Sequence, residues 1–247
     1  MPRVSVILVH YETPRFLQGA ISSVLSQTYR DFELHVIDDG STDPTVAPIL
    51  DGLGGIANVR VHRCETTNED RLASCRYATL INWACFGHTA GELVTFLMGD
   101  DAYYPDRLER MVTALDTANA EVVYGAQSLC DQHGVEFDIR PAQAPLHDAF
   151  ERVDLNSVLM KKSAFLEVRG FDEGPEWWRN ADAQLFRKLN AAGKVFYPVL
   201  GAPTDRKHFR PDSVTENVLK NLPPWHSDPL ATTVDHVPIG RRYEAVA

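Results

Sequence analysis

The first forty residues consist of two apolar-rich stretches separated by a helical pattern. Residues 4–9 and 32–37 are short runs rich in Val, Ile, Leu and Phe, the composition of strands buried in a parallel sheet. Between them, Thr13 and Pro14 form a favourable helix start, and apolar residues then recur at the spacing of one helix face, at Leu17, Ala20, Ile21, Val24 and Leu25. The pattern predicts a βαβ unit with a right-handed crossover.

The alternation of strand and helix patterns continues to about residue 200. It predicts strands over 58–62, 93–98, 122–124, 157–160 and 194–199, and helices over 73–86, from Pro105 onward and over 181–191. Residues 127–156 carry charges and prolines without a clear period, so we expect them at the rim of a site. Together these elements predict the α/β class, with a Rossmann-like, mostly parallel central sheet and flanking helices.

The chain is expected to form one domain over residues 1–225. Its 247 residues lie at the upper edge of the size of a single domain, and no repeat or low-complexity linker divides them. Periodicity ends near Asn221, so residues 226–247 are expected to form an irregular tail.

Composition excludes some partners. A formal net charge of −10 disfavours binding to nucleic acid or to an anionic membrane surface. No apolar window is long enough for a membrane span, and no signal sequence precedes the first strand, so we expect a cytoplasmic protein. The four cysteines lack zinc-site spacing and are expected to be reduced thiols, at Cys64, Cys75, Cys85 and Cys130.

Two acidic turns follow two of the predicted strands. Asp38 and Asp39 come directly after residues 32–37, and Asp100 and Asp101 come after residues 93–98. Ligands of an open parallel sheet bind beyond the carboxyl ends of its strands. Carboxylates gathered there favour a hard cation and the anion that the cation carries.

Several ordered motifs resemble family 2 glycosyltransferases. They lie at residues 4–11, 24–29, 36–43, 99–101, 104–108, 170–173, 182–189 and 193–195. Within that family, residues 71–73 and 221–224 are most similar to the bacterial spore-coat glycosyltransferase type. The resemblance covers about residues 3–225 and implies the GT-A fold, with a nucleotide-binding half over about 1–101 and an acceptor-side half over about 102–220.

The resemblance implies a nucleotide site at the first two strand ends. Asp39 would hold the base or ribose, Tyr11 would form an aromatic wall against the base, and Val9 would contribute backbone contacts. Taken alone, Asp38 and Asp39 fit an ordinary turn equally well. Arg71 would contact the nucleotide or its diphosphate, although a solvated charge run explains residues 68–71 as well.

The second acidic turn occupies the place of the family's metal motif. By resemblance, Asp101 is the ligand of Mn²⁺ or Mg²⁺, and Asp100 reaches the ribose or the sugar. Met98 and Gly99 stand where the commoner pattern has a further acid, which favours attachment of the metal through a single carboxylate. His208, in a basic cluster over residues 206–213, is a second candidate metal ligand within a lid over the diphosphate; an ordinary exposed loop is the alternative.

Asp182 matches the family's general base. In an inverting transfer, a carboxylate takes the proton of the acceptor hydroxyl that attacks the anomeric carbon. The alternative is an acid placed at a helix start because the helix dipole favours it there. Trp177 and Trp178 precede this position and could stack on an acceptor or close the edge of the core.

The sequence therefore predicts a metal-dependent, inverting glycosyltransferase with a nucleotide-diphospho-sugar donor and a small-molecule or glycan acceptor. An isomerase or mutase that rearranges the donor sugar without an acceptor is the alternative, and a non-catalytic nucleotide-sugar binding protein is a third. The base, the sugar, the acceptor and any association into homo-oligomers stay open.

Overall fold

The computed structural model describes residues 1–211 and residue 213, and its described strands form two sheets. The larger sheet has seven strands in the order β10-β6-β9-β4-β1-β2-β3. They span Val4–His10 (β1), Phe32–Asp38 (β2), Val59–Arg63 (β3), Leu93–Met98 (β4), Val122–Gly125 (β6), Val158–Lys161 (β9) and Phe196–Val199 (β10). All run parallel except β9, which is antiparallel to β4 and β6. The predicted mostly parallel sheet is confirmed.

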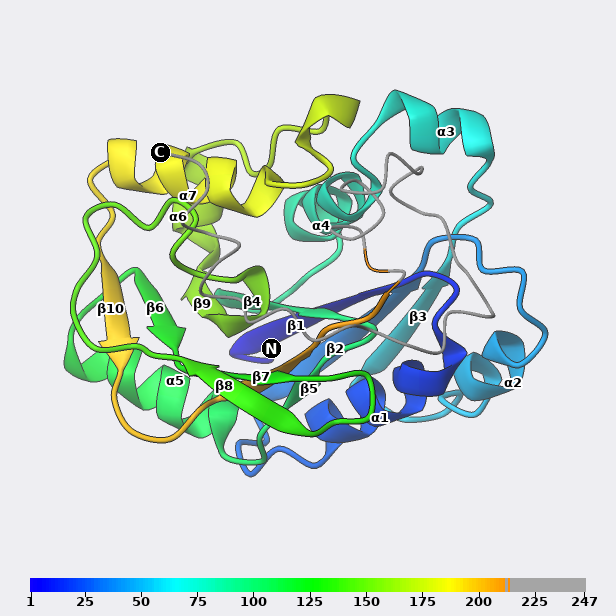
Figure 1. The fold of residues 1–247 in the computed structure, drawn as a ribbon, viewed down its shortest axis with the longest axis horizontal. Helices are drawn as coiled ribbons and strands as arrows, with labels where there is room; N and C mark the ends of the chain where they lie inside the picture. Colours follow the sequence, from blue (N-terminus) through cyan, green and yellow to red (C-terminus); the bar gives the residue numbers. More distant parts are fainter. Residues whose placement is uncertain (212, 214–247) are drawn as a thin grey trace.

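Helices cover both faces of this sheet (Figure 1). One face is covered by α1 (Pro14–Leu25), α2 (Val46–Asp51) and α5 (Arg107–Thr117). The other carries α4 (Arg76–Gly87), α6 (Lys162–Glu167) and α7 (Ala181–Ala191). The buried residues accordingly form two apolar clusters, one on each side of the sheet. This three-layer arrangement follows from strands that are apolar on both faces.

The smaller sheet has the order β5-β11-β7-β8 and lies in front of the larger one in Figure 1. Its strands are Ala102–Tyr103 (β5), Gln127–Cys130 (β7), Glu136–Arg140 (β8) and Asp205–His208 (β11). We expected irregular structure over 127–156 and a loop at the start of the basic cluster. Both expectations were wrong where β7, β8 and β11 form. Strand β11 consists of Asp-Arg-Lys-His, so it lacks the apolar alternation by which strands are predicted.

Short helices account for the remaining differences from the prediction. The helix expected from residue 73 begins at Arg76, because a separate helix, α3 (Asn68–Ala73), precedes it. A capping box fixes the start of α3: Thr67 accepts from the Asp70 amide, and the Asp70 carboxylate accepts from the Thr67 amide. Two 3-10 turns, Leu155–Ser157 and Pro175–Trp177, complete the described elements.

The four cysteines are free, as expected. Among the helices of the described residues, none combines the length and the apolar character of a membrane span. The expected tail over residues 226–247 and the end of the expected domain lie outside the described residues.

Candidate active site

The parallel register brings the two acidic turns to one edge of the sheet. Strand β1 lies between β2 and β4, and Val9 is paired with Ile37 on one side and Met98 on the other. Just beyond, the Asp39 amide donates to the His10 carbonyl (2.8 Å), and the Gly99 amide donates to the Val9 carbonyl (2.8 Å). The predicted meeting of the two turns is therefore confirmed, and the buried end of β1 lies between them.

Gly99 allows this close approach. A Cβ atom at position 99 would lie 2.7 Å from Nδ1 of His10, whose ring is buried. Any side chain at position 99 would therefore collide with His10 of β1. The departure from the family motif has a steric reason in this chain.

Asp39 is held by two arginines. Its Oδ1 accepts from Thr66 Oγ1 (2.6 Å) and from Nε and Nη2 of Arg76 (3.1 and 2.9 Å). Its Oδ2 accepts from Nη1 of Arg71, and its carbonyl accepts from Nη2 of the same guanidinium. Oδ1 is thus fully used, and Oδ2 is the oxygen with capacity for a further donor.

Arg71 also covers Tyr11. Its guanidinium lies 3.6 Å from the centre of the Tyr11 ring, which is cation–π geometry. The Arg71 carbonyl accepts from Nε1 of Trp178 (3.3 Å). Arg71 itself is only 2 % exposed, so the alternative of a solvated charge run does not hold at Arg71, which joins Asp39 to Tyr11.

The two carboxylates of the second acidic turn differ in their partners: Asp100 is paired with an arginine, whereas Asp101 has no Lys or Arg ion pair among the described residues. Asp100 Oδ2 accepts from Nε of Arg210 (2.9 Å). Burial alone would raise the pKa of Asp100, but Arg210 and Lys207 outweigh it and lower that pKa below its usual value. Asp101 instead accepts neutral donors, the His208 amide at 2.7 Å and the Asn156 side-chain amide. Burial, with the neighbouring Asp100 charge, raises the pKa of Asp101 well above its usual value.

These residues fit a divalent cation. A buried carboxylate that resists ionisation beside a second acid is stabilised by a positive charge. Nδ1 of His208 donates to the Asp100 carbonyl oxygen (2.7 Å), so Nε2 is the ring nitrogen that could bind a metal ion. Among the described residues, no group of three or more His, Cys, Asp or Glu side chains could hold a metal ion. Mg²⁺ and Mn²⁺ are suited to such a place, because they take most of their oxygens from phosphate and water.

Asp182 lies in the first turn of α7 and is half-buried. Its Oδ1 accepts from the Ala183 amide (2.8 Å). Burial, with a contribution from the Asp154 charge, raises the pKa of Asp182 to about 6. A carboxylate with a pKa near neutrality is suited to accept a proton from a hydroxyl and to release it again.

Asp154 is a site residue that the sequence did not reveal. Its Oδ2 lies 2.6 Å from Nζ of Lys207 and 3.6 Å from Nη1 of Arg140. These two cations keep the pKa of Asp154 below its usual value despite its burial. The charges of Asp154 and Lys207 act on both Asp101 and Asp182, so the second acidic turn and the candidate base belong to one electrostatic unit.

The two tryptophans differ in exposure. Trp178 is 9 % exposed and packs edge-on against Tyr77, 6.3 Å between ring centres. Trp177 is only partly buried and lies against the same apolar cluster. The position of Trp178 favours a packing role, whereas contact with an acceptor stays a prediction for Trp177.

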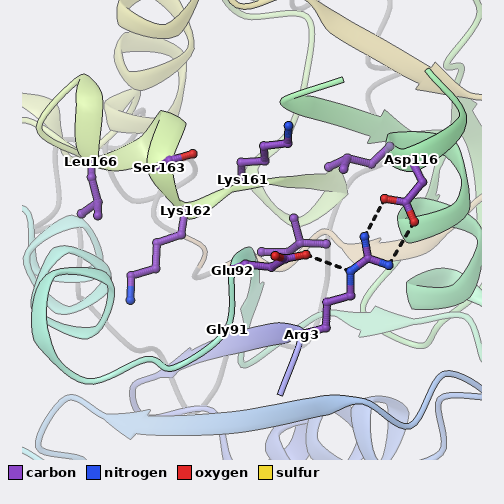
Figure 2. A pocket seen from close by; sticks show the side chains of 10 residues that line it. Arg3, Gly91, Glu92, Asp116, Lys161, Lys162, Ser163 and Leu166 are labelled. Atoms are coloured by element: carbon purple, nitrogen blue, oxygen red, sulfur yellow. Dashed lines mark hydrogen bonds and ion pairs between the residues drawn. The ribbon is translucent and has the colours of Figure 1, made fainter. Parts of the chain in front are cut away.

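A large hollow lies at the opposite edge of the sheet (Figure 2). Its volume is about 670 Å³, and it is lined by residues at the amino ends of β1 and β4 and at the end of α5. Arg3 is held there between Glu92 (3.0 Å) and Asp116 (2.6 Å), and Lys161 and Lys162 point in different directions. The charged groups of Arg3, Glu92 and Asp116 in the hollow are paired with one another, so the acidic edge is the candidate site.

Several known proteins are similar to this chain in sequence. The chain is similar to Protein CgeD of Bacillus subtilis (strain 168), with 33 % identity over 231 residues that cover 90 % of the chain and 53 % of CgeD. It is similar to the putative glycosyltransferase EpsE of the same strain, with 35 % identity over 78 % of the chain and 68 % of EpsE. The chain thus spans about half the length of CgeD.

A solved structure has the same architecture. The chain resembles S. aureus TarS residues 1–349 in complex with UDP-GlcNAc, with a TM-score of 0.65 and 18 % identity over 84 % of this chain and 59 % of TarS. The likeness concerns the fold, and it confirms the expected GT-A architecture. The sequence model of the family named Glycosyl transferase family 2 matches residues 5–161. With more than half of its length matched by that model, the chain belongs to glycosyl transferase family 2.

Proposed function

We propose that the chain is a metal-dependent, inverting glycosyltransferase that moves a sugar from a nucleotide-diphospho-sugar to an acceptor hydroxyl. One observation carries the proposal: two carboxylates with raised pKa, Asp101 and Asp182, lie within one electrostatic unit. One of them is placed to attach a cation, and the other to take a proton. Because the related fold of TarS is described with UDP and UDP-GlcNAc, a UDP-sugar is the first donor to test.

Each residue has a definite part in this proposal. Tyr11, Asp39 and Arg71 bind the nucleotide, and Asp100 binds the ribose or the sugar. Asp101, with His208 as a second ligand, would hold Mn²⁺ or Mg²⁺, which when bound neutralises charge on the leaving nucleoside diphosphate.

The transfer needs one proton acceptor. The acceptor hydroxyl oxygen bonds to the anomeric carbon while the bond from that carbon to the diphosphate breaks, which inverts the anomeric centre. Asp182 takes the hydroxyl proton, and the nucleoside diphosphate leaves with the electron pair of the broken bond. No second carboxylate is required as a nucleophile.

Calorimetric titration of UDP with and without Mn²⁺ tests the donor site. The wild-type protein should bind UDP with Mn²⁺ present, and Asp101→Asn, which keeps the shape but removes the charge, should lose at least about tenfold in affinity. Asp31→Asn, an exposed aspartate just before the amino end of β2, is the matched control and should bind like wild type. Equal affinity in Asp101→Asn would remove Asp101 as a metal ligand.

Product analysis separates transfer from rearrangement. Incubation of UDP-GlcNAc without an acceptor should give at most slow release of UDP, and addition of an acceptor should accelerate that release. Formation of an isomeric nucleotide-sugar without release of UDP would instead establish the isomerase or mutase.

A further inference from the structure

Glu12, immediately after Tyr11, has an unusual backbone conformation. Its φ is 46°, in the left-handed region, which glutamate seldom adopts because its Cβ crowds the backbone. Strained residues of this kind persist where the surroundings determine them, and they gather at binding sites. The contacts of the side chain identify what holds Glu12 there.

The carboxylate of Glu12 reaches across to the loop after β2. Oε1 accepts from the Thr42 amide (2.5 Å) and from Thr42 Oγ1 (2.7 Å), and Oε2 accepts from the Asp43 amide (3.2 Å). The Glu12 amide donates in turn to Ser41 Oγ (3.0 Å), which donates to Asp38 Oδ1. Glu12 therefore joins the loop after β1 to the loop after β2 through four hydrogen bonds.

The two joined loops carry the nucleotide side of the candidate site. Tyr11 precedes Glu12, and Asp39 lies in the loop that Glu12 grips. Arg71 contacts both of these residues at once, so their separation must be fixed for its guanidinium to lie on the Tyr11 ring and on the Asp39 carboxylate together. A left-handed turn at position 12 aims the carboxylate at the second loop while Tyr11 stays at the end of β1.

We propose that Glu12 is a positioning residue that sets the nucleotide-binding geometry of Tyr11 and Asp39 by joining the loops that carry them. The proposal rests on the nucleotide-sugar function proposed above and adds a determinant of donor affinity to it. Glu12 acts on binding and not on the proton transfer, because its contacts are confined to these two loops.

Substitutions at both ends of the link provide the test, with UDP and Mn²⁺ as the probe. Glu12→Asn tolerates the left-handed backbone but is too short to reach Thr42, so it should weaken UDP binding about tenfold. Glu12→Gln keeps an acceptor oxygen for Thr42 and should lose less. Thr42→Val removes one of the hydrogen bonds from the opposite loop and should weaken binding several-fold. The KM for the donor should rise in each variant while kcat stays within about twofold.

Glu151→Asn is the matched control. Glu151 also has a left-handed φ, 57°, but it is exposed and makes no side-chain bond with the described residues. Its substitution should leave UDP binding unchanged. If wild-type protein binds UDP and both Glu12→Asn and Thr42→Val bind it equally well, the role of Glu12 is wrong. If wild-type protein itself does not bind UDP, the donor assigned under the proposed function is what fails.

Discussion

Asp182→Asn is the most informative single change, because its expected effects on turnover and on stability have opposite signs. The substitution keeps the size of the side chain and removes its ability to take a proton. Loss of a general base costs about 10²- to 10⁴-fold in kcat. Donor affinity should stay near wild type, because we assign the nucleotide to Tyr11, Asp39 and Arg71 and not to Asp182.

The magnitude of the stability effect follows from the pKa. An aspartate in an unfolded chain ionises near 3.8, whereas Asp182 ionises at about 6 in the folded protein. Its folded-state pKa is raised, so the unfolded chain releases the proton first, and the contribution of Asp182 to stability falls as pH rises from about 4 to 6. A pKa shift of about 2 units corresponds to at most about 3 kcal/mol in the free energy of unfolding. The actual effect is smaller, because the side chain keeps some contact with solvent. At pH 7, Asp182→Asn should therefore melt at a higher temperature than wild type.

The assay is release of UDP from saturating UDP-GlcNAc, with water or an added polyol as the nucleophile, between pH 5 and pH 8. Wild-type kcat should follow the ionised fraction of Asp182, which falls from about 90 % at pH 7 to about 10 % at pH 5. In Asp154→Asn, the loss of kcat at acidic pH should move to lower pH. The substitution lowers the pKa of Asp182, because it removes one nearby negative charge and leaves the charges of Lys207 and Arg140 uncompensated. A folded Asp182→Asn variant with near wild-type turnover would refute the base assignment and favour the isomerase.

Two further predictions concern the donor site and acid stability. Arg76→Leu should raise the KM for the donor and leave kcat nearly unchanged, because Arg76 and Thr66 hold Oδ1 of Asp39 and so fix the carboxylate that we assign to the nucleotide. Steady-state kinetics would contradict this if kcat alone fell. The contribution of His10 and His62 to stability should fall as pH drops from about 6.5 towards 4, opposite to that of Asp182, because burial lowers the pKa of both histidines to about 4 and the unfolded chain takes up their protons first. On acidification through this range, His62→Gln should gain melting temperature relative to wild type, and an unchanged difference between the two would remove His62 from the explanation.

The central sheet could be predicted because most of its strands are short apolar-rich runs. Strands β1, β2 and β4 and helices α1 and α5 carry continuous or periodic apolar residues, and their predicted bounds match within a few residues. The second sheet could not be predicted in this way. Strand β11 carries Lys207 and His208 toward the acidic turn, and its pairing with β7 joins residues nearly eighty positions apart.

The two acidic turns of the candidate site could be predicted from the sequence, but the residues that contact them could not. The rule that ligands lie beyond the carboxyl ends of parallel strands located Asp39 and Asp101 from the sequence. It gave no means of finding their partners, because Asn156 reaches Asp101 from 55 positions away and Arg76 reaches Asp39 from 37. Pairings over such distances are set by the tertiary fold and leave no local pattern in the sequence.

The distribution of cations in the site distinguishes its carboxylates from one another. Asp39 is paired with Arg71 and Arg76, Asp100 with Arg210, and Asp154 with Lys207 and Arg140.

Asp101, Asp182 and Asp205 have no Lys or Arg ion pair among the described residues, and burial raises the pKa of all three. A structural carboxylate in the interior is stabilised by a fixed cation or, as Asp205 is by Gln127 and Thr204, by neutral donors. One that must take up a cation or a proton during a reaction cannot have that position already filled by a fixed cation. Asp101 and Asp182 meet this condition, and they are the two to which we assign the metal and the proton. Supplying a fixed charge to either, by Asn156→Lys beside Asp101 for example, should abolish the function of that carboxylate while leaving nucleotide binding through Tyr11 measurable.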